Sequence, residues 1–482
     1  MRSSSLRSSC LVTLAATAFV APAVAMANGN VSHQWVSRTA IESTPSEGSL
    51  ADLVGDPDLQ PLIDGGTMFP DWGYTPGATS EERDAGEASH WEPVQDAYRQ
   101  WILANYAPPW SDEARQHLAF YFGMTSHGMA DQSYDAMFFE RSRFYQGGDH
   151  GEFDQDSDVL WAATTGPAAV PETWTPASPL LELFQALVGV TIDERSMTQQ
   201  LGFVAVAIGA VNVLAEDPAQ VASAEADFPW AAEHDDDPLT PGNPPHEAEI
   251  VRRYWRSNWA LFHGDEVPRP VLWTHPADGG SGHGTDPASI ESWISIVFAR
   301  GLFSPELDAS RFHVVDSSGA EVPITIDLFY GNESHVLHVR PEEALLADEV
   351  YVVTVDAGIE TIHGELLEGW DFAFSTGDRA PDPLHDDGFW DEPDPYGDED
   401  PGTGGSDDAG VTGTDTGEGL DDSATGNGGG TTVDPTTATE GVRARGATSS
   451  CACTHGEGFG RRDVGGLALF GLMLLGWARR RP

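Results

Sequence analysis

The chain has 482 residues, and its 24 basic against 77 acidic side chains give a formal net charge of −53. The length and a hydrophobic fraction of 40% suffice for two or three folded domains. So acidic a surface repels nucleic acid and anionic membranes at long range, and it attracts divalent cations.

The first 27 residues have the pattern of a secretory signal peptide. Two arginines precede an apolar stretch that ends in small residues, with a cut expected near Ala25 or Ala27. Apart from Cys10 in this segment, the cysteines are Cys451 and Cys453 near the C-terminus. The exported body between them therefore has no thiol, and any zinc there must be held by histidines and carboxylates.

Residues 28–268 are expected to form a mostly helical domain. Several segments carry apolar residues at helical spacing, and clusters of Pro, Gly and Asp separate them. The segments are HWEPVQDAYRQWILANY (90–106), EARQHLAFYFGMTSHGMADQSYDAMFFERSRFY (113–145), PLLELFQALVGV (179–190), MTQQLGFVAVAIGAVNVLAED (197–217) and EAEIVRRYWRSNWALFHG (247–264).

The long central helix carries three potential ligands at a spacing of four: His127, Asp131 and Asp135. Positions four apart are neighbours on an α-helix, with Cβ atoms about 5–6 Å from each other. Two carboxylates buried without partners would be very costly. A divalent metal ion would neutralise them and use the imidazole. The alternative is an exposed helix whose polar face happens to carry these residues.

Five more candidate ligands lie in separate segments. His150 and Asp154 are again four apart, Asp71 follows a proline among aromatic residues, His90 precedes a helix, and His33 lies near the mature N-terminus. A lone histidine is more often a structural residue than a ligand. So many separate pieces in one helical domain, all with hard or borderline ligands, favour a multinuclear metal centre.

The order SH…FPDWGY…SHWEP…FGMTSHGMADQSYD…GDHGEFDQD resembles the zinc-dependent phospholipase C superfamily, and within it the N-terminal domain of glycosylphosphatidylinositol-specific phospholipase D. The similarity runs from about residue 33 to 161 and is weaker to 262. The resemblance implies a phosphodiesterase that hydrolyses a phospholipid or a related phosphodiester, with Asp71 touching metal and serving as the base. The zinc ligands it implies are His33, Asp71, His90, His127, Asp131, Asp135, His150 and Asp154.

Two positions depart from the pattern of that family. Asp135 lies where relatives usually have another histidine, which keeps a ligand type but could change the affinity or the choice of metal. Bacterial phospholipases C of the superfamily begin with a mature tryptophan whose amine and carbonyl bind metal. Here residues would remain before His33, and Trp35 lies beyond it. The resemblance implies two or three zinc ions, of which we expect two.

Residues 269–378 are expected to form an all-β sandwich. Short runs with partial alternation are separated by turn residues at the spacing of a small sandwich. The segment resembles the SbsA-type bacterial Ig-like domain, which implies a structural or spacer role. Its histidines have no paired carboxylates at ligand spacing, so we interpret them as surface or turn residues: His275, His283, His313, His335, His338 and His363.

The C-terminal part is expected to hold no folded domain. Residues 379–450 are dominated by Asp, Glu, Gly, Thr and Pro, which is typical of a disordered acidic stalk. Residues 451–482 contain a cysteine pair, an apolar run over 464–477 that is short for a membrane span, and terminal arginines. This arrangement resembles a MYXO-CTERM-type sorting signal, which implies a sorting protease and a membrane anchor. The alternative is an ordinary tail anchor.

The sequence therefore predicts a multidomain protein: an all-α metal-binding hydrolase domain, an all-β Ig-like sandwich, a disordered stalk and a short apolar C-terminal helix. We expect it to be exported and anchored at the cell surface or outer membrane, or released from there. The first alternative function is a single-strand nuclease, against which the acidic body and the absence of lysine argue, because phosphate backbones need cationic contacts. The second is a non-catalytic adhesion or structural protein whose helical domain is stabilised by metal.

Overall fold

The structure is a computed structural model of the chain. It describes residues 29–385, except 47, 149, 171–173, 304–306 and 331–332, together with Tyr396. The described residues all belong to one compact unit of the chain. The expected signal peptide (1–27) and C-terminal tail (451–482), and nearly all of the expected stalk (379–450), lie outside the described residues.

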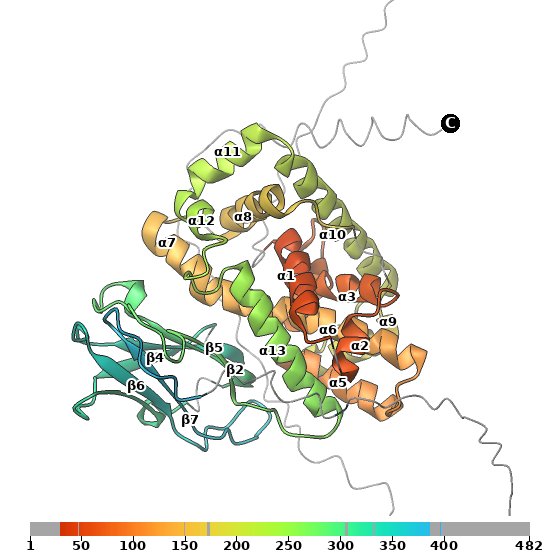
Figure 1. Ribbon diagram of the computed structural model, residues 1–482. Helices are drawn as coiled ribbons and strands as arrows, with labels where there is room; N and C mark the ends of the chain where they lie inside the picture. Colours follow the sequence, from red (N-terminus) through yellow and green to blue (C-terminus); the bar gives the residue numbers. More distant parts are fainter. Residues whose placement is uncertain are drawn as a thin grey trace, which may run out of the picture. The chain divides into compact units, whose positions relative to one another are not determined.

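The first part of the chain is helical, as predicted (Figure 1). Its α-helices are α1 (Asn30–Ser43), α2 (Ser49–Val54), α3 (Gln60–Thr67), α4 (Ser80–Ser89), α5 (Glu92–Asn105), α6 (Asp112–Ser133), α7 (Glu140–Gln146), α8 (His150–Thr165), α9 (Ala177–Leu183), α10 (Glu194–Ala215), α11 (Pro218–Asp227), α12 (Pro229–His234) and α13 (Pro244–Phe262). A 3-10 turn, η1 (Pro70–Tyr74), and two π-helical turns, η2 (Tyr134–Phe139) and η3 (Phe184–Val188), interrupt them.

The second part is an antiparallel β-sandwich, which confirms the predicted fold class. Its strands are β1 (Val271–His275), β2 (Ile294–Leu302), β3 (Phe312–Asp316), β4 (Ile324–Leu328), β5 (Ser334–Pro341), β6 (Val350–Val355) and β7 (Trp370–Ser375). They form one sheet in the order β1-β2-β5-β4 and another in the order β3-β6-β7. Short 3-10 turns, η4 (Ile290–Ser292) and η6 (Ala309–Arg311), lie between strands. Apolar residues from both sheets make one core, as alternating strands facing each other do.

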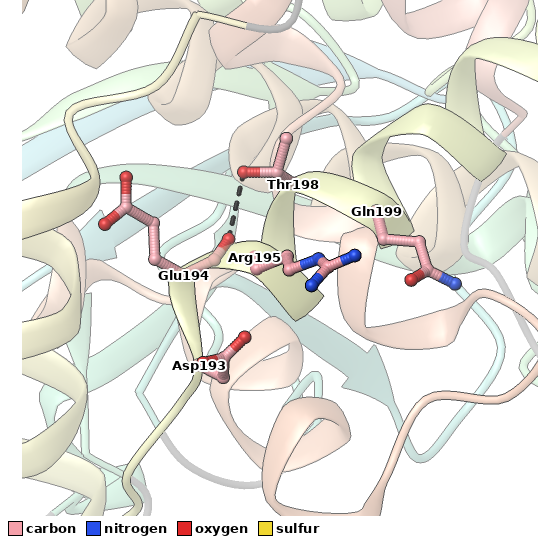
Figure 2. Close-up of a pocket in the computed structure, with 5 residues that line it drawn as sticks. All are labelled: Asp193, Glu194, Arg195, Thr198 and Gln199. Atoms are coloured by element: carbon pink, nitrogen blue, oxygen red, sulfur yellow. Dashed lines mark hydrogen bonds between the residues drawn. The ribbon is translucent and has the colours of Figure 1, made fainter.

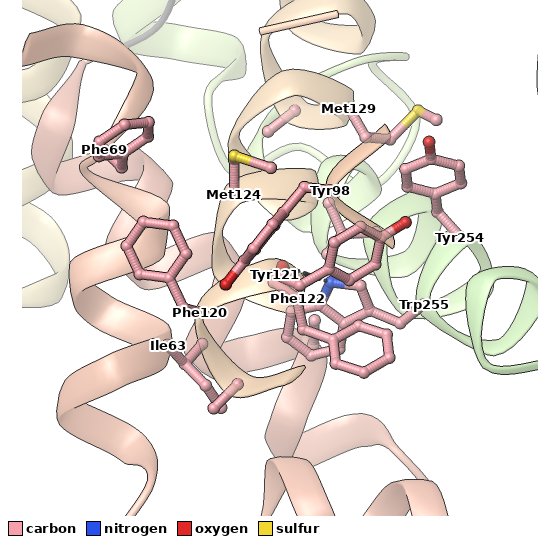
Figure 3. Packing of buried hydrophobic residues seen from close by; sticks show 14 of the residues in the cluster. Ile63, Phe69, Tyr98, Phe120, Tyr121, Phe122, Met124, Met129, Tyr254 and Trp255 are labelled. Atoms are coloured by element: carbon pink, nitrogen blue, oxygen red, sulfur yellow. Dashed lines mark hydrogen bonds between the residues drawn. The ribbon is translucent and has the colours of Figure 1, made fainter. Parts of the chain in front are cut away.

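Helix α6 is the centre of the helical part. Ser111 caps its N-terminus by accepting a hydrogen bond from the amide of Ala114 (3.2 Å). Every residue from His117 to Ser133 is buried. Figure 3 shows how aromatic side chains of this helix pack against residues of neighbouring helices, and Trp255 of α13 donates to the carbonyl of Phe122 (2.9 Å). A helix buried on all sides places its polar residues in the protein interior.

One described helix, α10, is long and apolar enough to cross a membrane by length and composition. It packs against α8, α11 and η1, and 28% of its apolar window is buried. Phe203, Val206 and Val213 are among its exposed apolar side chains. The sequence analysis expected a membrane segment at residues 464–477 and not at α10. Residues 464–477 lie outside the described residues.

Candidate metal centre

The fold gathers the eight predicted ligands from separate elements. They come from α1 (His33), η1 (Asp71), the residue that ends α4 (His90), α6 (His127, Asp131), η2 (Asp135) and α8 (His150, Asp154). Seven of them are buried, and His150 is partly exposed. The geometry divides them into an inner set (His33, Asp71, His90, His127, Asp131) and an outer set (Asp135, His150, Asp154).

In the inner set, Asp131 lies between three imidazoles. Its Oδ1 is 2.9 Å from Nε2 of His33, and its Oδ2 is 3.4 Å from Nε2 of both His90 and His127. Asp71 Oδ1 is 3.7 Å from the Nε2 atoms of the same two histidines. Two groups of three, His33–His127–Asp131 and Asp71–His90–His127, each have ligand atoms within 4.8 Å of one another. This is a spacing that one or two cations could bridge.

In the outer set, His150 lies between two carboxylates. Its Nε2 is 2.9 Å from Asp135 Oδ1, and its Nδ1 is 3.5 Å from Asp154 Oδ2. The predicted stripe on the central helix therefore divides. His127 and Asp131 are neighbours, but Asp135 pairs with His150 instead. The i→i+5 hydrogen bond from the amide of Glu140 to the carbonyl of Asp135 places the wider, π-helical winding just after Asp135.

Backbone carbonyls orient two of the imidazoles. His127 Nδ1 is 2.7 Å from the carbonyl oxygen of Thr67, and His90 Nδ1 is 2.9 Å from that of Gly86. Because a carbonyl can only accept, each Nδ1 carries the hydrogen, which leaves Nε2 of the neutral ring with its lone pair directed at the carboxylates. Metal-ligating histidines are commonly held in this way.

Two glycines of α6 permit this close packing. A Cβ at Gly123 would lie 2.1 Å from the carbonyl oxygen of Ile63 in α3, and one at Gly128 would lie 2.1 Å from the carbonyl oxygen of His90. Any side chain at either position would therefore push away the backbone that carries Thr67 or His90. The close approach of α3 and of the α4–α5 corner to α6 is what brings the inner set together.

The centre contains buried polar atoms that the protein itself does not satisfy. Among the residues that the structure describes, neither carboxylate oxygen of Asp71 or Asp154 has a hydrogen-bond partner, and neither does Nε2 of His127. Buried carboxylates without partners are strongly unfavourable. A divalent cation would satisfy these atoms, and a set of imidazole and carboxylate donors suits zinc. The residues present therefore fit a metal ion.

The acid–base properties of the centre show how strongly it attracts positive charge. Burial would lower the pKa of His90, but Asp71 and Asp131 raise it to about 9. In the same way burial would lower the pKa of His150, but Asp135 raises it to about 10. Burial and the neighbouring His33 lower the pKa of His127. A cation would compete with the protons that the carboxylates draw to these rings.

Two residues at this centre were missed by the sequence analysis. Asp158 of α8 accepts hydrogen bonds from the amides of Val31 (3.0 Å) and Ser32 (2.9 Å), and so fixes the first turn of the helix that carries His33. Its position four residues after Asp154 was a usable signal. Tyr330, from the turn after β4, donates a hydrogen bond to Asp135 Oδ2. No local pattern connects these two residues, which are 195 positions apart.

The expectation for the histidines of the sandwich was wrong in part. His283, His335 and His338 are buried, with exposed fractions of 6%, 1% and 1%, so none is a surface residue, and the last two lie in strand β5 and not in a turn. His335 and His363 lie 3.4 and 3.3 Å from the carboxylate of Glu92 in α5. These side chains help to join the sandwich to the helices, which the sequence pattern of the sandwich alone could not indicate.

A surface hollow at the start of α10 lies apart from this chemistry. Figure 2 shows its lining residues on the first turns of the helix, where Thr198 Oγ1 donates to the carbonyl of Glu194 (2.9 Å). None of the eight predicted ligands, all of which are described, lines it. The lining residues are Asp193, Glu194, Arg195, Thr198 and Gln199.

Comparison with solved structures gives only faint likenesses. CopC from Methylosinus trichosporium OB3b is 12% identical with a TM-score of 0.16, over 24% of this chain and 95% of that one. The S-layer protein rSbsC(31-844) is 9% identical with a TM-score of 0.19, over 69% of this chain and 46% of that one. TM-scores this low carry no argument about fold or function.

Comparison of sequences gives two findings. The family described as bacterial Ig-like domain matches residues 265–376. Phosphatidylinositol-glycan-specific phospholipases D are similar over a shorter part: the protein of Dictyostelium discoideum is 31% identical over 109 residues, 23% of this chain and 11% of that protein. The protein of Mus musculus is 32% identical over 139 residues, 27% and 16% of the two chains. The match thus spans less than a fifth of the length of these relatives, and the chain combines a bacterial Ig-like domain with a segment similar to phospholipase D.

Proposed function

We propose that the helical part of this chain is a zinc-dependent phosphodiesterase that hydrolyses a phospholipid or a related phosphodiester. One observation carries the proposal: separate elements converge to place three imidazoles around the buried carboxylates of Asp71 and Asp131. The partial similarity to phospholipases D supports a hydrolase of phospholipid-related substrates. The dependence on zinc is part of the proposal.

In this proposal the eight ligands hold two zinc ions. The inner set would supply most of the ligands, and the outer set would complete the second position with Asp135, His150 and Asp154. When bound, such cations stabilise charge on the phosphoryl oxygens and lower the pKa of a water molecule. Most of the donors are buried, so the electrostatic interactions would act in a low-dielectric setting.

The residues of the chain would contribute position and proton transfer. Asp71 is fully buried and neither of its oxygens has a hydrogen-bond partner among the described residues, so it is free to accept a proton from the attacking water. The carbonyls of Thr67 and Gly86 would keep Nε2 of His127 and His90 directed inward. Trp91 and Tyr74, near His90, are candidates for contact with the substrate.

We propose further that the protein is exported and held at the cell surface. The signal-peptide pattern of residues 1–27 and the sorting pattern of residues 451–482 support this, and a sorting protease would then act on the second. Removal of residues 451–482 should release the protein into the medium. Cell fractionation with an antibody against the sandwich measures this, and retention of the shortened protein at the surface would refute the anchor.

The test of the function is metal analysis of the purified mature chain, with His127→Ala and Asp131→Ala as variants. We expect about two zinc ions per chain and a sharp loss in both variants, because each residue belongs to the inner set. His313→Ala is the matched control, since this histidine pairs with Glu321 in the sandwich (2.7 Å) and should not affect zinc. Unchanged zinc in both variants would refute the assignment.

Turnover separates the candidate functions. The zinc-loaded chain is assayed on phospholipid vesicles and on single-stranded DNA. Hydrolysis of lipid alone supports the proposal, and hydrolysis of DNA alone supports the nuclease, against which the net charge of −53 argues. Bound zinc without turnover on either substrate supports an adhesion or structural protein.

A further inference from the structure

The sandwich is attached to the helices at points next to the predicted ligands. Gln132, which follows Asp131, accepts hydrogen bonds from the amide of His335 (2.9 Å) and the hydroxyl of Ser334 (3.3 Å). Tyr330 donates to Asp135 itself. Two of the connections from the sandwich thus reach the segment of chain that carries the central ligands.

A third connection lies two residues after His90. Glu92 accepts a hydrogen bond from the amide of Gly301 (2.6 Å) and pairs with Nη1 of Arg300 (2.6 Å). Both sandwich residues lie where the register of β2 against β5 is irregular, between Val297 and Leu302. A bulge of this kind frees an amide from the ladder and re-aims side chains. Here the irregular register directs the amide of Gly301 and the side chain of Arg300 at Glu92, the first residue of α5.

Tyr330 is held in an unusual backbone conformation. Its φ is +59°, in the left-handed region that aromatic residues rarely adopt. Its ring packs edge-on against Trp91, the neighbour of His90, with centroids 5.1 Å apart, and against Phe329 at 4.2 Å. Strained backbone at a residue that touches a candidate site is a recurring sign of a functional constraint.

We propose that the sandwich is part of the metal centre, not a spacer, and that Tyr330 is a positioning residue for Asp135. This inference rests on the proposed function, because it requires that a cation binds. Asp135 is then fixed at both oxygens: Tyr330 donates to Oδ2, and Oδ1 faces His150 at 2.9 Å. The hydrogen bond from the sandwich fixes the rotation of the carboxylate, so Asp135 would be oriented to hold a cation together with His150.

The experiment uses the full mature chain with Tyr330→Phe, which keeps the ring on Trp91 and removes the hydroxyl. Tyr145→Phe is the matched control. Tyr145 of α7 donates a hydrogen bond to Glu291 of η4 (2.7 Å), so it too joins the helices to the sandwich through a carboxylate. The exposed fraction of Tyr145, 46%, is close to the 41% of Tyr330. Of these two tyrosines, only Tyr330 forms a hydrogen bond with a predicted ligand.

Two measurements are made on each variant. Competition with a chelator gives the affinity for zinc, and the visible absorption of the cobalt-substituted protein reports the ligand geometry. We expect Tyr330→Phe to weaken the binding of one zinc ion about tenfold or more, as loss of an outer partner of a ligand does, and to change the cobalt spectrum. Tyr145→Phe should do neither. Equal behaviour of the two variants in both measurements would overturn the inference.

Folding and function are separated by further outcomes. If Tyr330→Phe lowers the unfolding temperature of the metal-free protein more than Tyr145→Phe, the cobalt spectrum at saturating metal decides. A changed spectrum supports positioning of Asp135, whereas an unchanged spectrum overturns it. A wild-type chain that binds no metal ends both the inference and the proposed function. A chain that binds zinc, shows the Tyr330 effect and hydrolyses nothing ends only the proposed function.

Discussion

His90 and His150 of the metal centre and His283 and His338 of the sandwich have opposite surroundings. His90 and His150 are set against aspartates, which outweigh burial and raise their pKa values to about 9 and about 10. His283 and His338 are buried away from carboxylates, so burial, with a further contribution from nearby arginines, lowers their pKa values to about 4 and about 3. The two pairs therefore differ in the charges around them: carboxylates face the first pair, and arginines lie near the second.

This difference shows how a cation site can be recognised in the interior of a protein. A buried neutral histidine without a carboxylate partner can have a purely structural role. His338 is an example, with its Nδ1 3.0 Å from Ser295 Oγ. A buried histidine facing aspartates lies in a region of negative potential that must be neutralised by protons or by metal. The prediction from the sequence relied on the same distinction.

Glu92 is an intermediate case, because it faces two histidines but is already neutralised by an arginine. Burial would raise the pKa of Glu92, but Arg300 and the nearby His335 and His363 lower it well below its usual range. Arg300 is only 2% exposed and its Nη1 lies 2.6 Å from Glu92. Such a set has no need of a metal ion.

Breaking this pair should have the largest effect on stability. Arg300→Met leaves Glu92 buried and unneutralised, which should cost about 3–5 kcal/mol of the free energy of unfolding. The double variant Glu92→Gln with Arg300→Met should recover most of it. Denaturant unfolding measures both. Asp327→Asn, which breaks the exposed pair of Asp327 with Arg340, is the control and should cost at most about 1 kcal/mol. Equal costs would mean that burial of the pair is irrelevant.

Removal of metal should affect the helical part and spare the β3-β6-β7 sheet of the sandwich. At a free zinc concentration of about 100 times Kd, binding contributes about 3 kcal/mol, so chelation should lower the unfolding temperature by about 5–10 °C. Hydrogen exchange locates the effect. Amides of α1, α6 and α8 should lose protection, while those of β3, β6 and β7 should not. Loss of protection in the strands first would contradict the comparison.

Acid should destabilise the sandwich through its neutral histidines. The pKa of His338 is 6.5 when unfolded and about 3 when folded. The unfolded chain therefore binds a proton that the folded chain excludes, so stability is full above pH 6.5 and is lost as the pH falls below it. At about pH 5 the loss from this residue should be about 2 kcal/mol.

His338→Gln tests this cause, since an amide can still bond Ser295 and does not titrate. Unfolding of both proteins is compared at about pH 7.5 and about pH 5 in chelator, so that loss of metal does not contribute. The variant should lose less stability on acidification than the wild type. An equal loss in both would show that His338 takes up its proton without unfolding the sandwich.

The parts of the centre that the sequence predicted are those with a local signal. His127 and Asp131, like His150 and Asp154, are four apart on helices, and helical geometry makes such pairs neighbours. That these pairs meet His33 and Asp71 rested on a family resemblance, since no local rule brings distant segments together. Alternation of apolar residues likewise indicated strands such as β6, whose positions alternate between buried and partly exposed, whereas β2 is buried at every position.

The parts that the sequence could not predict depend on the path of the chain in space. The pairing of Asp135 with His150 joins two different elements and was not foreseen, and neither was the π-helical turn that follows Asp135. The hydroxyl of Tyr330 reaches Asp135 only because two distant parts pack together. The buried histidines of the sandwich have no periodicity of their own, and their burial depends on what covers them.

The π-helical turn at Tyr134–Phe139 has a consequence for how such centres change during evolution. A π turn holds about one residue more than the α-helical turn it replaces. Deletion of one residue after Asp135 would let the helix run on regularly, and would turn the following residues by about 100° relative to Asp131 and Asp135. The number of cations could then change through helix length alone, with every coordinating side chain still in the sequence.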